Sequence, residues 1–479
     1  MAYDSKNRLN DLDSKQWLQF QKSWMPIEDA IAGQFVAFFT KQRYADGHTG
    51  RVLVFPQAAK QAMLQNSHPP RELILQNELP DGEKLDYVYL DFSRYTFEGF
   101  LSEFENQLFP LLMQAIRSLA LQRYLTVVIQ NHNTVHGRFP TAWKLARWLG
   151  RYLALKDEKI GCASPDNALP LSGENRSLPL AEGPWRTDNS IVYYMNFRKE
   201  KEPGAISFDP AILQPATRVI SSSSEAPEFI PKNFFNAWFI HKPPPRSRDV
   251  LLHPAKFPED LVQKFVQNFS REGEWVLDPM AGTGSALVAA ASMGRKACGI
   301  ELNPKFAQIA RSRFSLFESY QLVVGDASDG ETFSLLPEHV DYCITSPPYW
   351  DMLRMKGAET QKKRKNAGLP RWYSEDQRDL GNIADYSTFL DLLEKVYEHV
   401  SLRLRPGRYL TIIVKNVKKK GIIYPLAWDL AARLSRFLEF SGEQIWCQDD
   451  QRLAPFGYRY AWVSNTFHHY CLTFRKPFR

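Results

Sequence analysis

The chain contains the same segment twice. Residues 123–162 and residues 408–447 align without a gap at an offset of 285, and 16 of the 40 positions are identical. The identical positions include side chains that hydrophobic periodicity does not require, among them Asn131/Asn416, Trp143/Trp428 and Cys162/Cys447. Two unrelated units of one fold share a hydrophobic pattern but not such residues. We therefore interpret the chain as a tandem pair of related domains.

Weaker matches extend the repeat outward in both directions, for example between YYMNFRK (193–199) and YCLTFRK (470–476). A chain of 479 residues is also long for a single core. The predicted division is a first copy in residues 1–200, a linker in 201–244 and a second copy in 245–479. The linker rests on composition, because SSSSEAPEFIPKN (221–233) is rich in Ser and Pro.

Each copy alternates short apolar runs with amphipathic segments. Residues 127–131 and 411–416 are predicted strands, and residues 139–153 and 424–438 are predicted helices. This alternation predicts an α/β sheet with helices on both faces.

Composition sets wider limits. The net charge of +7 and pI near 8.9 permit a polyanionic partner without identifying one. No stretch approaches the length of an apolar membrane span, and the N-terminus lacks a signal-peptide core, so we expect a cytoplasmic protein without membrane contact. The five cysteines have no CxxC spacing, which favours reduced thiols and no metal site.

A glycine-containing turn is the most specific local motif. Residues 275–277 form a predicted strand, residues 278–284 (DPMAGTG) a tight turn, and the next predicted strand ends at Glu301. Gly282 and Gly284 allow a ligand to approach the backbone closely, since a Cβ atom there would collide with it. Several nucleotide-binding folds use such a turn, but this one is neither GxGxxG nor a phosphate-binding P-loop.

A second motif follows about sixty residues later. The predicted strand 341–345 runs directly into Ser346-Pro347-Pro348-Tyr349-Trp350. The two prolines restrict the backbone and so fix where the neighbouring carbonyl and side chains point. Alone, such a loop is ordinarily only a stiff connection, but the preceding glycine turn makes it informative.

Together with HPAKFPED (253–260), these motifs resemble those of the cytosine-N4/adenine-N6 DNA amino-methyltransferases of the TSPPYW type. The resemblance implies two tandem Rossmann-like methyltransferase domains, the first degenerate, and S-adenosylmethionine as cofactor. Asp278 would face the amino acid end of the cofactor, Glu301 the ribose and Asp326 the adenine. The cofactor-binding set that it implies is His253, Pro254, Phe257, Asp278, Pro279, Ala281, Gly282, Gly284, Ser285, Glu301 and Asp326.

The resemblance also implies methyl transfer to the exocyclic amino group of a DNA base, with Ser346, Pro347, Pro348 and Tyr349 as catalytic residues. Ser346 Oγ and the Pro347 carbonyl would accept the amino N–H groups, and Tyr349 or Trp350 would stack on the extruded base. Such catalysis depends on positioning and electrostatics without a covalent intermediate. Serine in first place favours cytosine N4 over adenine N6. The alternatives are an RNA guanine-N2 methyltransferase and a non-catalytic nucleic-acid-binding protein.

Residues 351–383 form an insert that the first copy lacks. Its basic and aromatic side chains are expected to contact the phosphates and bases of double-stranded DNA. The expected DNA-binding residues are Trp350, Lys356, Lys362, Lys363, Arg364, Lys365, Trp372 and Tyr373. Lys418, Lys419 and Lys420 would extend the basic surface. A restriction or defence protein is a further candidate partner.

The first copy lacks both motifs. Asp91-Phe92-Ser93-Arg94-Tyr95 stands in place of the Pro-Pro loop, and residues 52–60 contain no glycine. We therefore expect this copy to be catalytically silent. Our hypothesis is a monomer whose copies form an internal pseudo-dimer, with the first copy clamping the duplex. The alternative is circular permutation, with residues 86–310 as the relic of another motif order.

Overall fold

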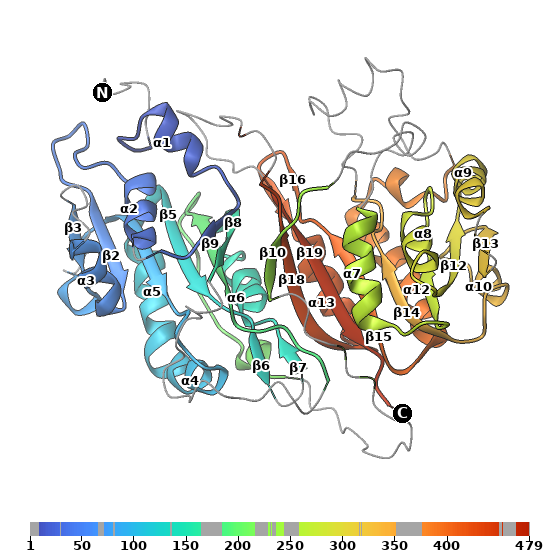
Figure 1. Ribbon diagram of the computed structural model, residues 1–479. Helices are drawn as coiled ribbons and strands as arrows, with labels where there is room; N and C mark the ends of the chain where they lie inside the picture. Colours follow the sequence, from blue (N-terminus) through green and yellow to red (C-terminus); the bar gives the residue numbers. More distant parts are fainter. Residues whose placement is uncertain are drawn as a thin grey trace.

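The computed structural model describes residues 9–28, 30–65, 71–79, 82–134, 137–163, 184–215, 229, 231, 236–243, 258–315, 317, 319–350, 376–449, 453 and 466–478. Within these ranges the chain forms two large mixed sheets side by side (Figure 1). No helix in the described ranges has the length and apolar character needed to cross a bilayer.

The first sheet has the strand order β1-β8-β9-β5-β4-β2-β3. Its central strands are parallel, and β9 runs antiparallel to both of its neighbours. The strands are β1 (Trp24–Pro26), β2 (Arg51–Phe55), β3 (Glu72–Ile74), β4 (Leu85–Asp91), β5 (Leu119–Ile129), β8 (Ala154–Cys162) and β9 (Ile191–Arg198). A separate hairpin joins β6 (His132–Thr134) to β7 (Gly137–Phe139).

The second sheet repeats this plan with the order β10-β18-β19-β15-β14-β11-β12-β13, again with one antiparallel strand, β19. Its strands are β10 (Trp238–Ile240), β11 (Trp275–Asp278), β12 (Lys296–Glu301), β13 (Tyr320–Val324), β14 (Val340–Thr345), β15 (Leu404–Val414), β18 (Glu439–Cys447) and β19 (His468–Arg475). The hairpin here is β16 (Val417–Lys419) and β17 (Ile422–Tyr424). The predicted α/β class with two tandem Rossmann-like sheets is confirmed.

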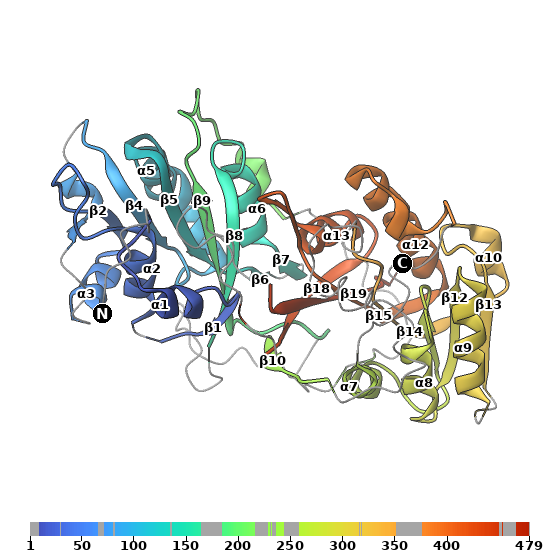
Figure 2. The ribbon, with the colours of Figure 1, turned by 90° about the horizontal axis from the view of Figure 1, so that it is seen from above.

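Helices cover both faces of each sheet (Figure 2). In the second half, α7, α8 and α9 lie on one face and α12 and α13 on the other. The first-half helices are α1 (Ser14–Gln19), α2 (Ile31–Phe39), α3 (Gln57–Gln65), α4 (Phe97–Glu103), α5 (Phe109–Ser118) and α6 (Thr141–Leu149). The second-half helices are α7 (Glu259–Phe269), α8 (Ser285–Ala291), α9 (Pro304–Phe314), α10 (Gly330–Ser334), α12 (Tyr386–Arg403) and α13 (Leu426–Leu434).

The halves differ at one end of the sheet. The second half continues from β11 through α8, β12 and α9 to β13, whereas the described part of the first half passes from β2 through α3 to β3 alone. Strand β3 pairs in parallel with β2 as β12 pairs with β11, so the strand without a counterpart among the described residues of the first half is the edge strand β13.

Two details of the sheets bear on the sequence-based expectations. Strand β10 falls inside the predicted linker 201–244, yet it pairs in parallel with β18, so the linker prediction is wrong for this segment. Its sequence, Trp-Phe-Ile, is apolar enough to extend a sheet edge. Residues 86–310 of the permutation alternative are divided between the two sheets, since β4 and β5 pair within the first sheet and β11 and β12 within the second.

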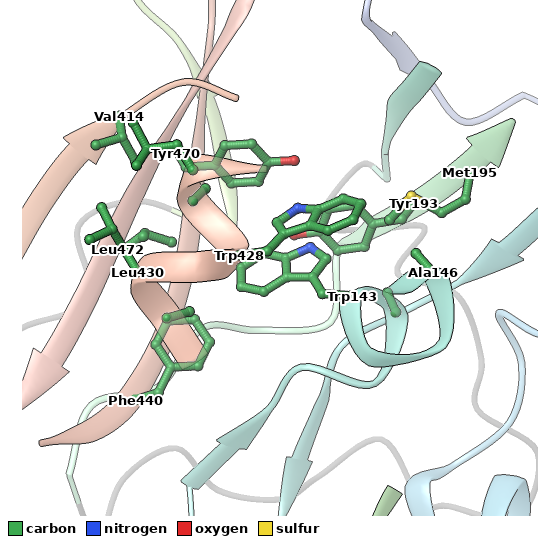
Figure 3. Close-up of a cluster of buried hydrophobic side chains, with 14 of the residues drawn as sticks. Trp143, Ala146, Tyr193, Met195, Val414, Trp428, Leu430, Phe440, Tyr470 and Leu472 are labelled. Atoms are coloured by element: carbon green, nitrogen blue, oxygen red, sulfur yellow. The ribbon is translucent and has the colours of Figure 1, made fainter. Parts of the chain in front are cut away.

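The two halves meet at a pseudo-two-fold axis formed by matched residues. Trp143 of α6 stacks on Trp428 of α13, and Tyr193 and Tyr470 lie on either side of the pair (Figure 3). Both indoles are buried. The repeat is therefore packed as an isologous interface, in which the same surface of each half meets the other.

Candidate functional site

A cavity opens at the carboxyl ends of strands β11 to β14. The strand order reverses between β11 and β14, and ligands of open α/β sheets bind at such a switch point. The cavity encloses about 920 Å³, including the part open to solvent. It is lined by Pro279, Met280, Ala281, Gly282, Thr283, Ser285, Glu301, Leu302, Asn303, Phe306, Gly325, Asp326, Ala327, Ser346, Pro347, Pro348, Arg378, Asp379, Leu380 and Val396.

The predicted glycine turn forms one wall of this cavity. Gly282 and Gly284 both have positive φ, 55° and 79°, which side chains with a Cβ rarely adopt. A Cβ on Gly284 would also stand 3.0 Å from the Ala310 Cβ of α9. Gly284 therefore lets the turn pack against α9, while Gly282 lies on the cavity wall.

Glu301 ties this turn to the end of β12. Its carboxylate accepts hydrogen bonds from Gly282 N and Asn303 N, both at 2.7 Å. Burial raises the pKa of Glu301 to about 7, although these two donors favour the charged form. At the end of β13, Asp326 lines the same cavity and accepts from Ser328 N at 2.8 Å. Both acids thus present oxygen acceptors to a ligand.

Asp278 lies behind the cavity wall. Its Oδ1 accepts a hydrogen bond from Thr345 Oγ1 at 2.6 Å and one from Met280 N at 3.1 Å, and the residue is only 1% exposed. Burial raises its pKa to about 6. The structure therefore differs from the expectation that Asp278 faces the cofactor. Its observed role is to join the end of β11 to the end of β14, just before Ser346.

The Pro-Pro loop forms another part of the wall, with Ser346, Pro347 and Pro348 all lining the cavity. Tyr349 is buried, its hydroxyl shares a side-chain hydrogen bond with Ser346, and burial raises its pKa. The loop and the glycine turn, some sixty residues apart, thus line a single cavity.

Trp350 is only 3% exposed, which corrects the expectation that it contacts DNA. Its indole packs against Tyr386 and Tyr424, with ring centroids 5.0 and 4.4 Å away. The Lys419 ammonium lies 4.4 Å from the ring centroid. In this structure Trp350 anchors the end of the loop.

Helix α7, which follows the HPAKFP segment, is fastened to the glycine turn. Glu259 accepts a hydrogen bond from Ser285 Oγ at 3.1 Å and forms an ion pair with Arg313. Arg313 in turn donates to the Thr283 carbonyl at 2.7 Å. Glu259 therefore supports the turn from outside the cavity.

Several predicted residues lie outside the described ranges. They are His253, Pro254, Phe257, Lys356, Lys362, Lys363, Arg364, Lys365, Trp372 and Tyr373. Their contacts remain predictions. Among the described residues, no cluster of His, Cys, Asp or Glu is placed to hold a metal ion, and all five cysteines are buried free thiols.

Sequence reasoning missed part of the wall. Asn303 and Phe306 follow Glu301 closely, so the position of the acid at a strand end was a usable signal for them. Arg378 and Asp379 come from a segment far along the chain, and no local pattern marked them.

In the first half, the ends of the strands equivalent to β11 and β14 carry different residues. Phe55 and Phe92 occupy the positions of Pro279 and Pro347, and their rings pack together with centroids 5.8 Å apart. Asp91, at the position of Ser346, is held by Ser93 N and Oγ, and burial raises its pKa. Aromatic rings thus replace both prolines at the equivalent strand ends.

The residues at the cavity fit S-adenosylmethionine. Two carboxylates at adjacent strand ends supply acceptors for hydroxyl and amino groups, and Pro279 and Phe306 supply apolar surface for a ring. The backbone at Gly282 can approach a ligand closely because no Cβ intervenes.

Comparison with known proteins agrees with this chemistry. The family described as DNA methylase matches residues 94–312. The type II methyltransferase M.MthZI of Methanothermobacter thermautotrophicus is 31% identical over 129 residues, which is 25% of this chain and 36% of that protein. A tRNA (guanine(10)-N2)-dimethyltransferase of the same species is 25% identical over 205 residues, covering 40% and 55%. The matched region spans 23–39% of the length of the first three curated relatives.

Solved structures with partial similarity include a TehB-like SAM-dependent methyltransferase from Corynebacterium glutamicum. It has 14% identity and a TM-score of 0.27, with coverage of 45% of this chain and 86% of the other. The family match over residues 94–312 and these sequence relatives support the resemblance of this chain to the N4/N6 amino-methyltransferase family of DNA methylases.

Proposed function

We propose that this chain is an S-adenosylmethionine-dependent DNA methyltransferase that methylates the exocyclic amino group of a base, cytosine N4 in preference to adenine N6. The observation that carries the proposal is the shared cavity, which Ser346 and Pro347 line together with Gly282 and Glu301. A methyl donor held by the turn would therefore lie beside the loop that holds the acceptor.

The loop residues would act on the acceptor nitrogen. An amino group conjugated to a base ring is a poor nucleophile because its lone pair is delocalised into the ring. Ser346 Oγ and the Pro347 carbonyl would each accept one N–H bond, which favours a pyramidal nitrogen and returns the lone pair. The prolines keep both acceptors in place, so this stabilisation needs no rearrangement during the reaction.

The cofactor, when bound, supplies the electrophilic methyl group of a sulfonium ion. Glu301 and Asp326 would orient it through its hydroxyl and amino groups, and the Gly282 backbone would lie against it. Asp278 would support the reaction indirectly, since its hydrogen bond to Thr345 fixes the start of the loop. The methylated nitrogen then loses a proton to solvent or to a neighbouring acceptor.

The target base must leave the helical stack to reach the cavity. The lysine-rich insert and its aromatic residues, Trp372 and Tyr373, would contact the DNA phosphates and the opened strand. The preference for cytosine rests on serine, in place of aspartate, at the first position of the loop.

We further propose that the first half does not transfer methyl groups. The replacement of Pro279 and Pro347 by Phe55 and Phe92 supports this. The first half would then contribute to methyl transfer only through its contacts with the second half.

The test is transfer of tritiated methyl groups to double-stranded DNA, followed by identification of the modified base. Ser346→Ala and Pro347→Ala should lower transfer by about 100-fold or more, as for other groups that hold a transition state. Ser93→Ala, in the equivalent loop of the first half, is the matched control and should leave transfer unchanged. Equal loss in all three variants, or no transfer by the unaltered protein, would contradict the proposal.

A second candidate is methylation of guanine N2 in RNA. The match to the tRNA dimethyltransferase favours it, because that match is longer than the one to M.MthZI. Parallel assays on tRNA and on DNA separate the two candidates, since the preferred polymer should accept methyl groups at a much higher kcat/KM.

A further inference from the structure

The end of the Pro-Pro loop is covered by the β16–β17 hairpin. Tyr424 of β17 packs on the Trp350 ring, and Lys419 of β16 places its ammonium over the same ring. Trp350 follows Tyr349 directly, so the position of the hairpin sets the position of the loop that lines the cavity. A displaced hairpin would release Trp350 and the loop residues before it.

The hairpin is fastened to the first half of the chain, where it lies against β8 (Figure 1). Lys418 of β16 forms an ion pair with Asp157, whose side chain is completely buried. Asn416, just before the hairpin, donates to Glu158 Oε1 at 2.6 Å. Two adjacent acids of β8 therefore hold the hairpin from across the pseudo-two-fold axis.

A second connection runs through β19. The Tyr470 hydroxyl donates to Glu158 Oε2 at 2.9 Å. Its neighbour His468 shares a hydrogen bond with Ser23 Oγ at 2.8 Å. The next residue, His469, lies beside Tyr349 of the loop, with ring centroids 6.4 Å apart. The first half thus contacts the supports of both Tyr349 and Trp350.

The pseudo-symmetry supplies a comparison within one molecule. Glu443 is the counterpart of Glu158, and it accepts from Asn131 at 3.1 Å and from Tyr193 at 3.1 Å, as Glu158 does from Asn416 and Tyr470. The general interface therefore needs this glutamate on both sides.

The carboxylate before it is different. The counterpart of Asp157 is Gly442, and the counterpart of Lys418 is Asn133, so this ion pair has no direct equivalent. On the other side, Arg138 of β7 forms a buried ion pair with Glu443 instead. Each hairpin is thus joined to the opposite half by an ion pair, and on the side of the Pro-Pro loop the hairpin held in this way also covers Trp350.

We propose that Asp157 and Glu158 of the first half are positioning residues for the Pro-Pro loop of the second half, acting through the β16–β17 hairpin and Trp350. The first half is then part of the machinery for methyl transfer without binding the cofactor or the base. The expected effect on kcat rests on the proposed function. The expected effect on the position of the loop rests on the contacts described above.

The test uses full-length Asp157→Asn and Glu158→Gln. The matched control is the double variant Glu443→Gln with Arg138→Met, because Glu443→Gln alone would leave the buried Arg138 charge unpaired. Two readouts are needed: hydrogen exchange of the backbone at residues 346–350, which requires no methyl transfer, and kcat with the dissociation constant of S-adenosylmethionine. In the two test variants, exchange at the loop should accelerate and kcat should fall about tenfold or more, while cofactor affinity changes by less than about threefold. The control should keep loop exchange and kcat near those of the unaltered protein.

Loss of stability is separated by a double variant, Asp157→Asn with Lys418→Met. Removing Lys418 as well avoids leaving its charge unpaired. The buried Lys159 ammonium, 3.9 Å from Asp157, still loses a carboxylate, so stability should return in part. If kcat and loop protection also return, Asp157 acts only through stability and the positioning role is refuted. Unchanged loop exchange in the test variants, or an equal effect in the control variant, would likewise overturn it. Absence of methyl transfer in the unaltered protein would refute the proposed function alone, because the exchange experiment remains decisive.

Discussion

Trp143 and Trp428, which occupy the same position in the two repeats, stack on each other with ring centroids 6.1 Å apart and planes 13° from parallel. Cys162 and Cys447 likewise approach each other, with their sulfur atoms 3.9 Å apart. Residues that match between the repeats therefore meet at the axis that relates them. In an isologous interface each residue must suit its own counterpart, so a change on one side disturbs both halves.

Replacing either tryptophan of this pair by alanine should destabilise the protein by about 3–5 kcal/mol, since each leaves a large cavity in a buried interface. The double variant should lose less than the sum, because the second truncation removes contacts that the first has already weakened. Urea unfolding followed by far-UV circular dichroism measures this. Trp17→Ala, in the separate core beneath α2, is the control and should add to Trp428→Ala without coupling.

The glycine turn and the Pro-Pro loop were predictable because each needs particular residues directly after a strand. Asn131 and Asn416 were also visible as matched residues, but their partners, Glu443 and Glu158, come from the opposite repeat. Sequence spacing within one copy cannot indicate such a contact. The burial of Trp350 was missed for the same reason, since the side chains that cover it belong to α12 and to a hairpin some seventy residues later.

Gly284→Ala should disrupt the cofactor turn. The substitution combines a left-handed φ of 79° with a close contact of 3.0 Å to Ala310. The matched control is Gly273→Ala, where φ is 78° but no atom lies within 4 Å of the added Cβ. The control should lower the free energy of unfolding by about 1–2 kcal/mol through backbone strain alone. Gly284→Ala should lower it by more and should also weaken the binding of S-adenosylmethionine, which calorimetry measures. Similar behaviour of the two variants would contradict the packing role of Gly284.

Thr345→Val should impair both stability and turnover. It removes the 2.6 Å hydrogen bond to Asp278 and leaves that buried carboxylate with the Met280 N–H. The expected cost is about 1–3 kcal/mol, together with a further rise in the pKa of Asp278. Thr411→Val serves as the control because Thr411 Oγ1 pairs with the neutral Thr473 hydroxyl. Denaturant unfolding and kcat are measured on both variants. A larger loss in Thr345→Val than in Thr411→Val would show that the hydrogen bond to the Asp278 carboxylate supports stability and turnover.

The raised pKa of Glu301, about 7, predicts opposite effects of pH on cofactor binding and on stability. Hydroxyl groups need the ionised carboxylate as acceptor, so affinity for S-adenosylmethionine should fall as pH drops through 7. The stability of the protein without cofactor should change with pH in the opposite direction. An acid whose pKa is higher in the folded state than its ordinary 4.5 makes folding more favourable when protonated, so stability is lost as pH rises from about 4.5 to 7.

The size of this loss should be about 1–3 kcal/mol, since Glu301 is only partly screened from solvent. Glu301→Gln should therefore raise the melting temperature of the free protein at pH 8 and abolish the pH dependence of cofactor binding near 7. The exposed Glu331→Gln is the control and should change neither quantity. A Glu301→Gln protein that binds S-adenosylmethionine as tightly as the unaltered protein at pH 8 would show that the carboxylate does not hold the cofactor. Thermal unfolding and calorimetric titration from pH 5.5 to 8.5 separate the stability effect from the binding effect, because only the first persists without cofactor.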